Sequence, residues 1–416
     1  MITKNMQQQK IRHNQQLDNL TKYTQVLHGN NYNRQTINSK NLLFLKKKEF
    51  DIFYSTTYKY PLLVAESITA LTGKTDPNEP PIDRRIIEDP FRQDTDVPSH
   101  QQFTLEDYRE YMAYGGSMGH NAPAGQHKTN MNVYGETFLL TNMTPQEMVF
   151  NSGLWVLIEN WCRNLGRITK LEKIMIFTGS IPDRKNKVFN GVKMNVPCKM
   201  FKIVCLKIAN RPDMTSMEIF ICDNKPHNVF NNEDNNIQNA ISLLPYLVSH
   251  NKLMDFQRES GVSIRDLLEY YDFAPYKIRS FRDHLNMEMY LNTGMKIQMK
   301  RSKWFGKIIY ARTLDYLERQ WSECQKYATE FGSMEFHKEY YELIKKRLQE
   351  NSNVVSQSSH INHTVKPNIT KQSERNKLRH KQRQTKGINK TRKIIKIRRM
   401  RKIKTRKMNR TKRNMK

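Results

Sequence analysis

The sequence lacks the features of secreted and membrane-spanning proteins. Residues 1–17 are polar and contain no apolar stretch of the kind found in signal peptides. No run of roughly 18 apolar residues occurs along the chain, which argues against a membrane-spanning helix. These absences predict an intracellular protein that is not secreted and does not associate with membranes.

The few cysteines show no metal-binding or disulfide pattern. There are five of them, scattered among apolar residues: Cys162, Cys198, Cys205, Cys222 and Cys324. None belongs to a Cys-x-x-Cys pair, and their number is odd. We therefore expect buried thiols in a reducing compartment, with no zinc or redox role.

Acidic residues are almost absent from the C-terminal end. Residues 366–416 contain 23 Lys or Arg and one acid, Glu374, which gives this tail a charge of +22 out of +30 for the chain. Such a tail cannot bury enough apolar surface to offset its chain entropy, so it is predicted to be disordered when alone. Its natural partner is a polyanion such as nucleic acid. A nuclear address or a solubilising arm would have the same composition.

The order of the elements predicts an α+β protein in four segments. Residues 1–45 are rich in Asn and Gln and are predicted to be disordered. Residues 46–279 read as one folded domain, residues 280–350 as a helical extension, and residues 351–416 as a disordered basic tail. Strands come first and helices follow without a β-α-β rhythm, which favours the α+β class.

Short apolar runs predict the strands, and one proline-containing motif predicts a helix. The strand candidates are residues 50–54, 62–64, 137–141, 173–177, 200–208 and 217–221. The run from Thr144 to Glu147 matches a capping box with proline at the first helical position. A helix is therefore predicted from there to about Leu165, ended by Gly166. Ser263 is predicted to cap a later helix.

Two motifs carry the residue types needed to hydrolyse a phosphodiester. His120 follows a glycine-containing turn, and Asn151, Trp155, Glu159 and Arg163 follow at intervals of four. A histidine can act as a base near neutral pH. An amide oxygen suits Mg²⁺, which needs few protein ligands. A carboxylate and an arginine complete the set.

Glu159 has two interpretations. It lies eight residues after Asn151, which is about 12 Å along an ideal helix. Because helical side chains tilt toward the N-terminus, Glu159 would lean back and could order a water on the metal. A surface carboxylate that pairs with Arg163 at i+4 is equally consistent with the spacing.

The ordered motifs resemble the DNA/RNA non-specific endonucleases, the ββα-metal family that includes endonuclease G. That family has Asp-Arg-Gly-His, then Asn-x-x-Pro-Gln, then Asn-x-x-x-Trp-x-x-x-Glu. This chain has Ser-Met-Gly-His at residues 117–120, Asn-Met-Thr-Pro-Gln at 142–146, and the third motif at 151–159. Phe-Arg-x-Asp at residues 91–94 resembles the family's substrate-binding arginine segment. The resemblance covers roughly residues 48–275.

The resemblance implies a ββα-metal nuclease fold, with a central antiparallel sheet and flanking helices. It implies a sugar-nonspecific endonuclease that uses Mg²⁺, or Mn²⁺, and leaves 5′-phosphate ends on DNA, RNA or both. A homodimer is compatible with it. The residues assigned are His120 as general base, Asn151 as metal ligand, Glu159 and Arg163 as catalytic groups, and Arg92, Arg163 and Asn142 as substrate contacts.

Two departures from the family pattern leave an alternative open. Ser117 replaces the aspartate of the first motif, and Met118 replaces its arginine, which removes a cation beside His120. Arg92 or Lys128 could compensate for that loss. The alternative is a catalytically weakened or inactive nucleic-acid-binding or packaging protein on the same fold. The Asn-, Lys- and Ile-rich composition is also compatible with a viral source, in a virion or an infected host cell.

Overall fold

A computed structural model describes most of the chain between residues 41 and 361. The described residues are 41–69, 72–80, 82, 90–168, 171–183, 185–209, 211–227, 240–275, 277–281, 285 and 287–361. The chain divides into two compact units, residues 1–350 and residues 351–416. The predicted disordered segments at residues 1–40 and 362–416 lie outside the described residues.

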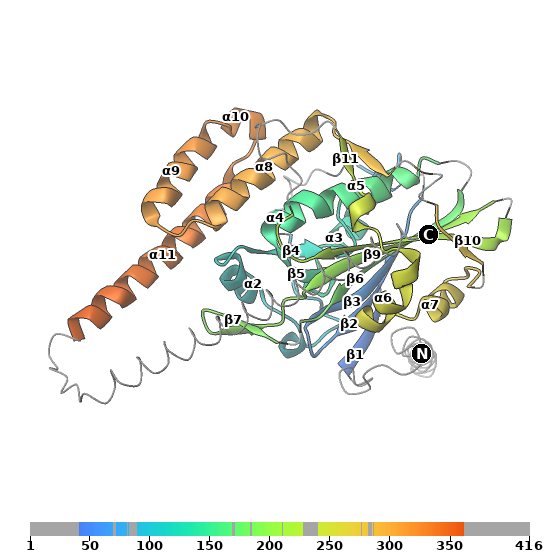
Figure 1. Cartoon of the computed structure of the whole chain (residues 1–416), viewed down its shortest axis with the longest axis horizontal. Coiled ribbons are helices and arrows are strands. Elements are labelled where there is room, and N and C mark those ends of the chain that lie inside the picture. The colour runs from blue at the N-terminus through green and yellow to red at the C-terminus, as the bar shows by residue number, and fades with distance from the viewer. Residues whose placement is uncertain are drawn as a thin grey trace, which may run out of the picture. The chain divides into compact units, whose positions relative to one another are not determined.

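A seven-stranded sheet forms the centre of the first unit (Figure 1). Its strands, in sheet order, are β1 (Leu42–Lys46), β2 (Phe50–Ser55), β3 (Tyr60–Ser67), β6 (Leu171–Ile181), β9 (Lys199–Ile208), β10 (Arg211–Asp223) and β12 (Ile278–Arg279). All neighbours are antiparallel except β10 and β12, which are parallel. The predicted α+β class with a central antiparallel sheet is therefore confirmed.

Both faces of the sheet are apolar and both are covered by helices. Along β6, Ile174 and Ile176 pack with the helix α5 (Val156–Leu165), whereas Phe177 packs with α6 (Leu253–Ser260) and α7 (Ile264–Tyr270). This alternation follows from the two-residue period of a strand. Figure 1 shows α5 on one side of the sheet and α6 and α7 on the other.

In the described part of the chain, the remaining elements are further helices and three two-stranded ribbons. The helices are α2 (Leu105–Met112), α3 (Met131–Glu136), α4 (Met148–Phe150), α8 (Thr293–Ile309), α9 (Leu314–Gln325), α10 (Ala328–Phe331) and α11 (Glu335–Ile361). The ribbons pair β4 (Gly116–His120) with β5 (Met143–Glu147), β7 (Lys187–Phe189) with β8 (Val192–Met194), and β11 (Ala240–Ser242) with β13 (Glu288–Tyr290).

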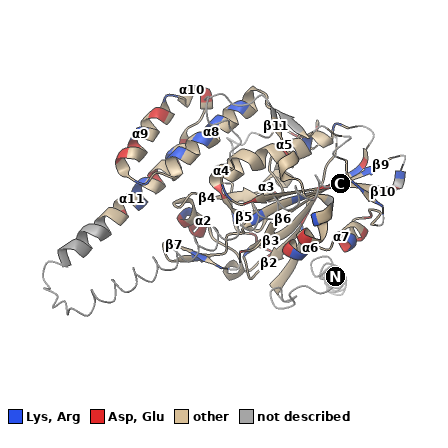
Figure 2. Ribbon diagram, viewed as in Figure 1, with Lys and Arg blue, Asp and Glu red and all other residues tan. Residues whose placement is uncertain are grey.

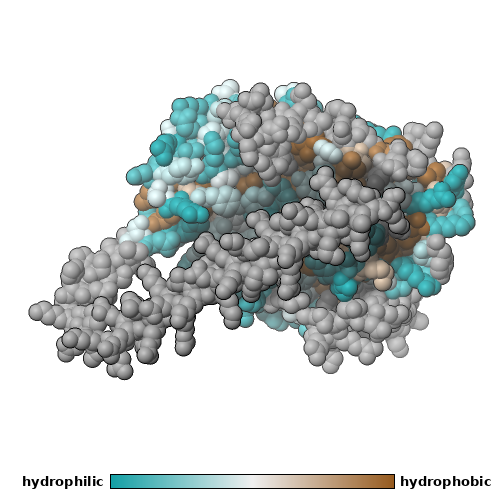
Figure 3. Space-filling view, viewed as in Figure 1, coloured by the Kyte–Doolittle hydropathy of each residue, from teal (hydrophilic) through white to brown (hydrophobic). Residues whose placement is uncertain are grey.

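The predicted helical extension is present and packs around a core of its own. Residues of α8, α9, α10 and α11 form this apolar cluster together with Met112 of α2 and Met148 of α4. The last helix continues to Ile361, so the prediction that disorder begins at residue 351 is wrong for residues 351–361. In Figure 3 the visible surface of this extension is mainly hydrophilic.

Two local predictions are wrong. Residues 137–141 were expected to form a strand, but Thr137 ends α3 and residues Leu140–Asn142 form a 3₁₀ turn. Thr144 was expected to start a helix, but it lies in β5, where its hydroxyl accepts a hydrogen bond from Asn121 instead of capping a helix. The helix begins at Met148, after Glu147 has capped it through Val149 N and Phe150 N.

The start of the folded part was also placed too late. Residues 42–45 were expected to be disordered, but they form β1, which pairs along its whole length with β2. The capping role predicted for Ser263 is confirmed, because its side chain accepts a bond from Asp266 N. All five cysteines are free, and four are buried, whereas Cys198 is exposed. None of the described helices is long and apolar enough to cross a membrane.

Gly179 tests the packing of the sheet. It lies in β6, and a Cβ there would sit 2.1 Å from the ring of Phe201 and 2.7 Å from the carbonyl oxygen of Leu62. Gly179→Ala should therefore lower the free energy of unfolding by about 1–3 kcal/mol, measured by urea titration. Gly294→Ala is the control, since only Asn292 Oδ1 lies near its new methyl group, at 3.5 Å. Equal stability of both variants would contradict the packing described.

Candidate active site

The β4–β5 ribbon positions His120. His120 is the last residue of β4 and lies opposite Met143 of β5. Its half-buried ring packs against two aromatic rings, with centroids 5.7 Å from Phe91 and 5.2 Å from Phe138. The edge contact with Phe138 fixes the plane of the imidazole, so the aromatic residues set the direction in which its nitrogens point.

The same aromatic contact brings the predicted arginine segment to His120. Arg92, next in the chain to Phe91, donates its backbone N–H to Phe138 O at 3.3 Å and accepts from Leu140 N at 2.9 Å. Its side chain is exposed. Two residues on, Asp94 is buried and accepts bonds from Lys47 at 2.7 Å and Thr141 at 2.6 Å. Asp94 therefore anchors the segment while the guanidinium of Arg92 faces solvent.

Asn151 is tied to the same ribbon. Its amide Nδ2 donates to Ser117 Oγ at 3.1 Å, and Ser117 in turn donates to Gln146 O at 3.1 Å. The bond to Nδ2 orients the amide so that Oδ1, the atom that suits a hard cation, points away from Ser117. Ser117 stands where the family motif has aspartate, and here it acts as a link between β4 and Asn151.

The helix that carries Asn151 is not the continuous helix that the sequence predicts. Residues Asn151–Trp155 form a π-helical turn with non-helical dihedrals at Gly153, and α5 begins only at Val156. The spacing of an ideal helix therefore does not hold between Asn151 and Glu159. A π-turn inside a helix is rare and occurs frequently at functional sites. The predicted end at Leu165, before Gly166, is confirmed.

Asn142 lies behind the site and not on its surface. It is fully buried, and its Nδ2 donates to Ala122 O at 2.9 Å and Thr137 O at 2.8 Å, while Oδ1 accepts from Ala122 N at 2.9 Å. Both amide hydrogens are used, so the predicted substrate contact by Asn142 is not available in this arrangement. Asn142 instead fixes the backbone just after His120.

Glu159 is buried, which excludes the interpretation as a surface carboxylate. Its exposed fraction is 8%. Burial raises the pKa of Glu159, Lys202 and Arg163 lower it, and Glu66 raises it again, which together give a pKa of about 7. Glu159 therefore changes its protonation state near neutral pH, which a surface partner of Arg163 would not do.

The sequence does not predict the buried charge network that lies beside Glu159. His127 lies between two carboxylates, with Nδ1 2.9 Å from Glu49 Oε2 and Nε2 2.8 Å from Glu66 Oε2. The other oxygen of Glu66 is 4.0 Å from the ammonium of Lys202, which is fully buried and donates to Thr178. These residues come from separate segments, and no local sequence pattern connects them.

His127 is held as a cation by its neighbours. Burial alone would lower the pKa of His127, but its hydrogen bonds to Glu49 and Glu66 outweigh this and raise the pKa to about 9. Both ring nitrogens are then donors, so His127 is unsuited to bind a metal.

Arg163 approaches the loop that follows His120. A Cβ on Gly125 would lie 2.8 Å from Arg163 Nη2, and a Cβ on Gly73 would lie 2.9 Å from its Cδ. The two glycines thus leave a passage through which the arginine side chain runs. Gln126 of the same loop donates to Glu159 O at 3.2 Å. The loop after His120 is therefore fastened to α5 at Glu159 and lined by Arg163.

The donor set is compatible with a cation that needs few protein ligands. Among the described residues, no group of three or more His, Cys, Asp or Glu is arranged to hold a metal ion. The half-buried Asn151, whose amide is oriented by Ser117, is the group that fits. Mg²⁺ keeps several waters and takes only one or two protein oxygens in such sites.

Comparison with known proteins places the chain in a family. The sequence model of the DNA/RNA non-specific endonuclease family matches residues 28–263, and the chain therefore belongs to this family. The match includes Arg92, His120, Asn151, Glu159 and Arg163. It ends before α8, so the helical extension lies beyond the matched region.

Individual relatives are similar over part of their length. "Nuclease EXOG, mitochondrial" of Danio rerio is 29% identical over 42% of this chain, which spans 50% of that relative. "Nuclease C1" of Cunninghamella echinulata is 29% identical over 54% of this chain, and the match covers 84% of that relative's length. A chain of the EndoG/EndoGI complex aligns over 62% of this chain and 96% of its own, at 20% identity and a TM-score of 0.45.

The charge network gives a pH dependence of stability with a defined sign. Because the pKa of His127 rises from about 6.5 in the unfolded chain to about 9 in the fold, its stabilisation is complete below pH 6.5. The stabilisation is lost as the pH rises through 9, and its size is about 3 kcal/mol. We expect urea unfolding to show that the wild type has a higher free energy of unfolding than His127→Gln at pH 6. Most of this difference should be lost by pH 9.5.

The exposed His100 provides the control for this measurement. His100→Gln should follow the wild-type curve across the range. A constant difference between wild type and His127→Gln at all pH values would contradict the assignment of the charge to His127.

Proposed function

We propose that the chain is a Mg²⁺-dependent endonuclease that hydrolyses phosphodiester bonds of DNA, RNA or both and leaves 5′-phosphate ends. The observation that carries this proposal is the arrangement around the β4–β5 ribbon. His120 stands at one end of β4 with its ring against Phe91, which precedes the exposed Arg92 in the chain, and Asn151 is bonded to Ser117 of the same strand. Membership of the nuclease family supports the reaction class.

His120 is the group that moves a proton. As a neutral imidazole it takes a proton from the water that attacks phosphorus. Arg92 and Arg163 are the groups that bind the phosphate, because a guanidinium offers two parallel donors to phosphate oxygens. Asn151 would hold Mg²⁺ through Oδ1, where the ion would supply stabilisation of the negative charge on the leaving oxygen.

Glu159 is proposed to position the loop that follows His120 and the side chain of Arg163. It is buried, its backbone oxygen accepts from Gln126 in the loop after His120, and Lys202 and Arg163 lie within electrostatic reach of its carboxyl. A group with a pKa of about 7 alters the charge around Arg163 as the pH crosses neutrality. The rate of cleavage is therefore expected to change with the protonation of Glu159 near neutral pH.

Met118 does not remove the only cation from the site. It lies on the same side of β4 as His120, because side chains alternate along a strand, and it is half buried against the main apolar core. Arg92 is exposed and follows Phe91, whose ring contacts His120, so we propose it as the cation that replaces the missing arginine. This favours the enzyme over the inactive binding protein that the missing arginine suggests.

The role of His120 is tested by His120→Ala. A general base contributes about 10²–10⁴-fold, so plasmid and RNA cleavage with Mg²⁺ should fall by that factor while the melting temperature and nucleic-acid affinity change little. His100→Ala is the matched control and should cleave as the wild type does. Wild-type turnover by His120→Ala would exclude the base assignment.

A wild-type protein that binds nucleic acid but cleaves none with Mg²⁺ or Mn²⁺ would support the alternative. The chain would then be a binding or packaging protein on the nuclease fold.

The role of Asn151 is tested by its dependence on metal. EDTA should abolish cleavage by the wild type. Asn151→Ala should raise the Mg²⁺ concentration for half-maximal cleavage by roughly tenfold or more, since loss of even an outer partner of a metal site weakens binding that much. The exposed Asn164, on α5, gives the control variant Asn164→Ala. An unchanged Mg²⁺ requirement in Asn151→Ala would place the metal elsewhere.

A further inference from the structure

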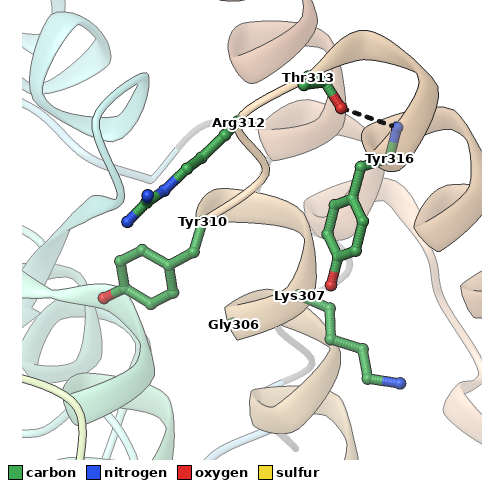
Figure 4. A pocket seen from close by; sticks show the side chains of 6 residues that line it. All are labelled: Gly306, Lys307, Tyr310, Arg312, Thr313 and Tyr316. Carbon is green, nitrogen blue, oxygen red and sulfur yellow. Dashed lines mark hydrogen bonds between the residues drawn. The ribbon is translucent and has the colours of Figure 1, made fainter.

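A cavity of about 310 Å³ lies where α8 meets α9 in the helical extension. Its lining residues are Gly306, Lys307, Tyr310, Arg312, Thr313 and Tyr316. Figure 4 shows Tyr310 and Arg312 on one side of the cavity and Tyr316 and Lys307 on the other. The tyrosines are 48% and 38% exposed, which is high for aromatic residues. Exposed rings flanked by cations are the combination that binds a nucleobase by stacking and its phosphates by charge.

All the charged residues of the helix that leads to this cavity are basic. α8 contains no acid and five cations: Lys296, Lys300, Arg301, Lys303 and Lys307. The four lysines recur at spacings of four, three and four, which places them along one face of the helix. Figure 2 shows this recurrence along α8. Lys300 pairs with Glu330 at 2.7 Å, whereas the ammonium of Lys307, which lines the cavity, lies 3.9 Å from the centroid of the Trp304 ring.

The cavity is connected to the candidate active site through hydrogen bonds. The hydroxyl of Tyr310 donates to Glu147, and Glu147 caps the short helix α4 that ends directly before Asn151. Glu147 also faces Gly116 in the ribbon, four residues before His120. Four residues of strand span roughly 13 Å. A single-stranded nucleic acid bound at His120 would therefore reach the cavity within a few nucleotides.

We propose that this cavity is a subsite for one nucleotide of a single-stranded part of the substrate. The base stacks against Tyr316, and the adjoining phosphates contact Lys307 and Arg312. The inference rests on the proposed nuclease function and adds a path for the strand beyond His120. Stacking does not distinguish bases, so the subsite is expected to accept any sequence. It should also prefer unpaired strands, because a base within a duplex is already stacked on its neighbours.

The test is photo-crosslinking with the full-length protein. Single-stranded oligonucleotides carrying one 5-iodouracil at successive positions are irradiated with the protein in EDTA, and the crosslinked residues are identified by mass spectrometry. We expect crosslinks at Tyr316, from a narrow range of positions in the oligonucleotide. Mapping by residue separates this subsite from contacts made by the basic tail. A duplex of the same sequence should crosslink less.

Three variants separate stacking from charge. Tyr316→Leu keeps an apolar side chain but removes the ring, so affinity for a single-stranded oligonucleotide should fall by about fivefold or more with an unchanged salt dependence. Lys307→Gln should reduce the slope of log affinity against log salt by about 0.7. Lys277→Gln is the control. Lys277 lies outside the cavity lining, directly before the edge strand β12, and pairs with Asp213, so the substitution should change neither the affinity nor the salt dependence.

The outcomes distinguish this inference from the proposed function. Crosslinks at Tyr316 in a protein that cleaves nothing would keep the subsite and reject the nuclease activity. Cleavage by the wild type with crosslinks outside residues 306–316, and unchanged affinity in Tyr316→Leu, would reject the subsite. A Tyr316→Leu variant with a lowered melting temperature is replaced by Tyr316→Phe, which keeps the ring and should keep the crosslink.

Discussion

The close packing of the β4–β5 ribbon is the constraint on which the site depends. A Cβ on Gly116 would lie 2.2 Å from the ring of Tyr111, and a Cβ on Gly119 would lie 2.1 Å from the side chain of Gln146. Only glycine lets the ribbon approach both neighbours. The glycine directly before His120 is therefore required by packing, and it also fixes where the histidine emerges from the strand.

The second constraint is the balance of buried charge. Glu49 and Glu66 are matched by His127 and Lys202, so the network closes with two charges of each sign. Isolated buried ions are costly, whereas paired and hydrogen-bonded ones are tolerated. Glu159 lies next to this network as a further acid, and its raised pKa is what the added negative charge and the burial would produce.

The sequence predicts the sheet better than it predicts the region around the site. The strands β2, β3, β6, β9 and β10 are apolar runs of ordinary strand composition, and all were predicted, although shorter than observed. β5 was missed because its Thr-Pro-Gln-Glu sequence is that of a helix start. Tertiary contacts decide the outcome, since Thr144 pairs with Gly119 and bonds Asn121 in the ribbon. The helix then begins three residues later than the pattern indicates, at Met148 instead of Pro145.

The site residues divide in the same way. The motifs single out His120, Asn151 and Arg92, and the roles of these residues stay predictions. They leave the exposure of Glu159 open and place Asn142 among the substrate contacts, because burial depends on segments that are distant in sequence. The local pattern does not predict the π-turn either, and this turn contacts a helix distant in sequence: the hydroxyls of Ser152 and of Ser302 on α8 lie 2.9 Å apart. No local pattern records that bond.

The extension from α8 to α11 is consequently part of the site's framework. Gln298 donates to Ser152 O at 3.0 Å, inside the π-turn that begins at Asn151. Tyr310 bonds Glu147 at the end of β5, and Tyr340 donates to Gly116 O at the start of β4. These bonds hold both strands of the ribbon at the end opposite His120. The orientation of Asn151 relative to β4 thus depends on helices that lie beyond the region matched by the family.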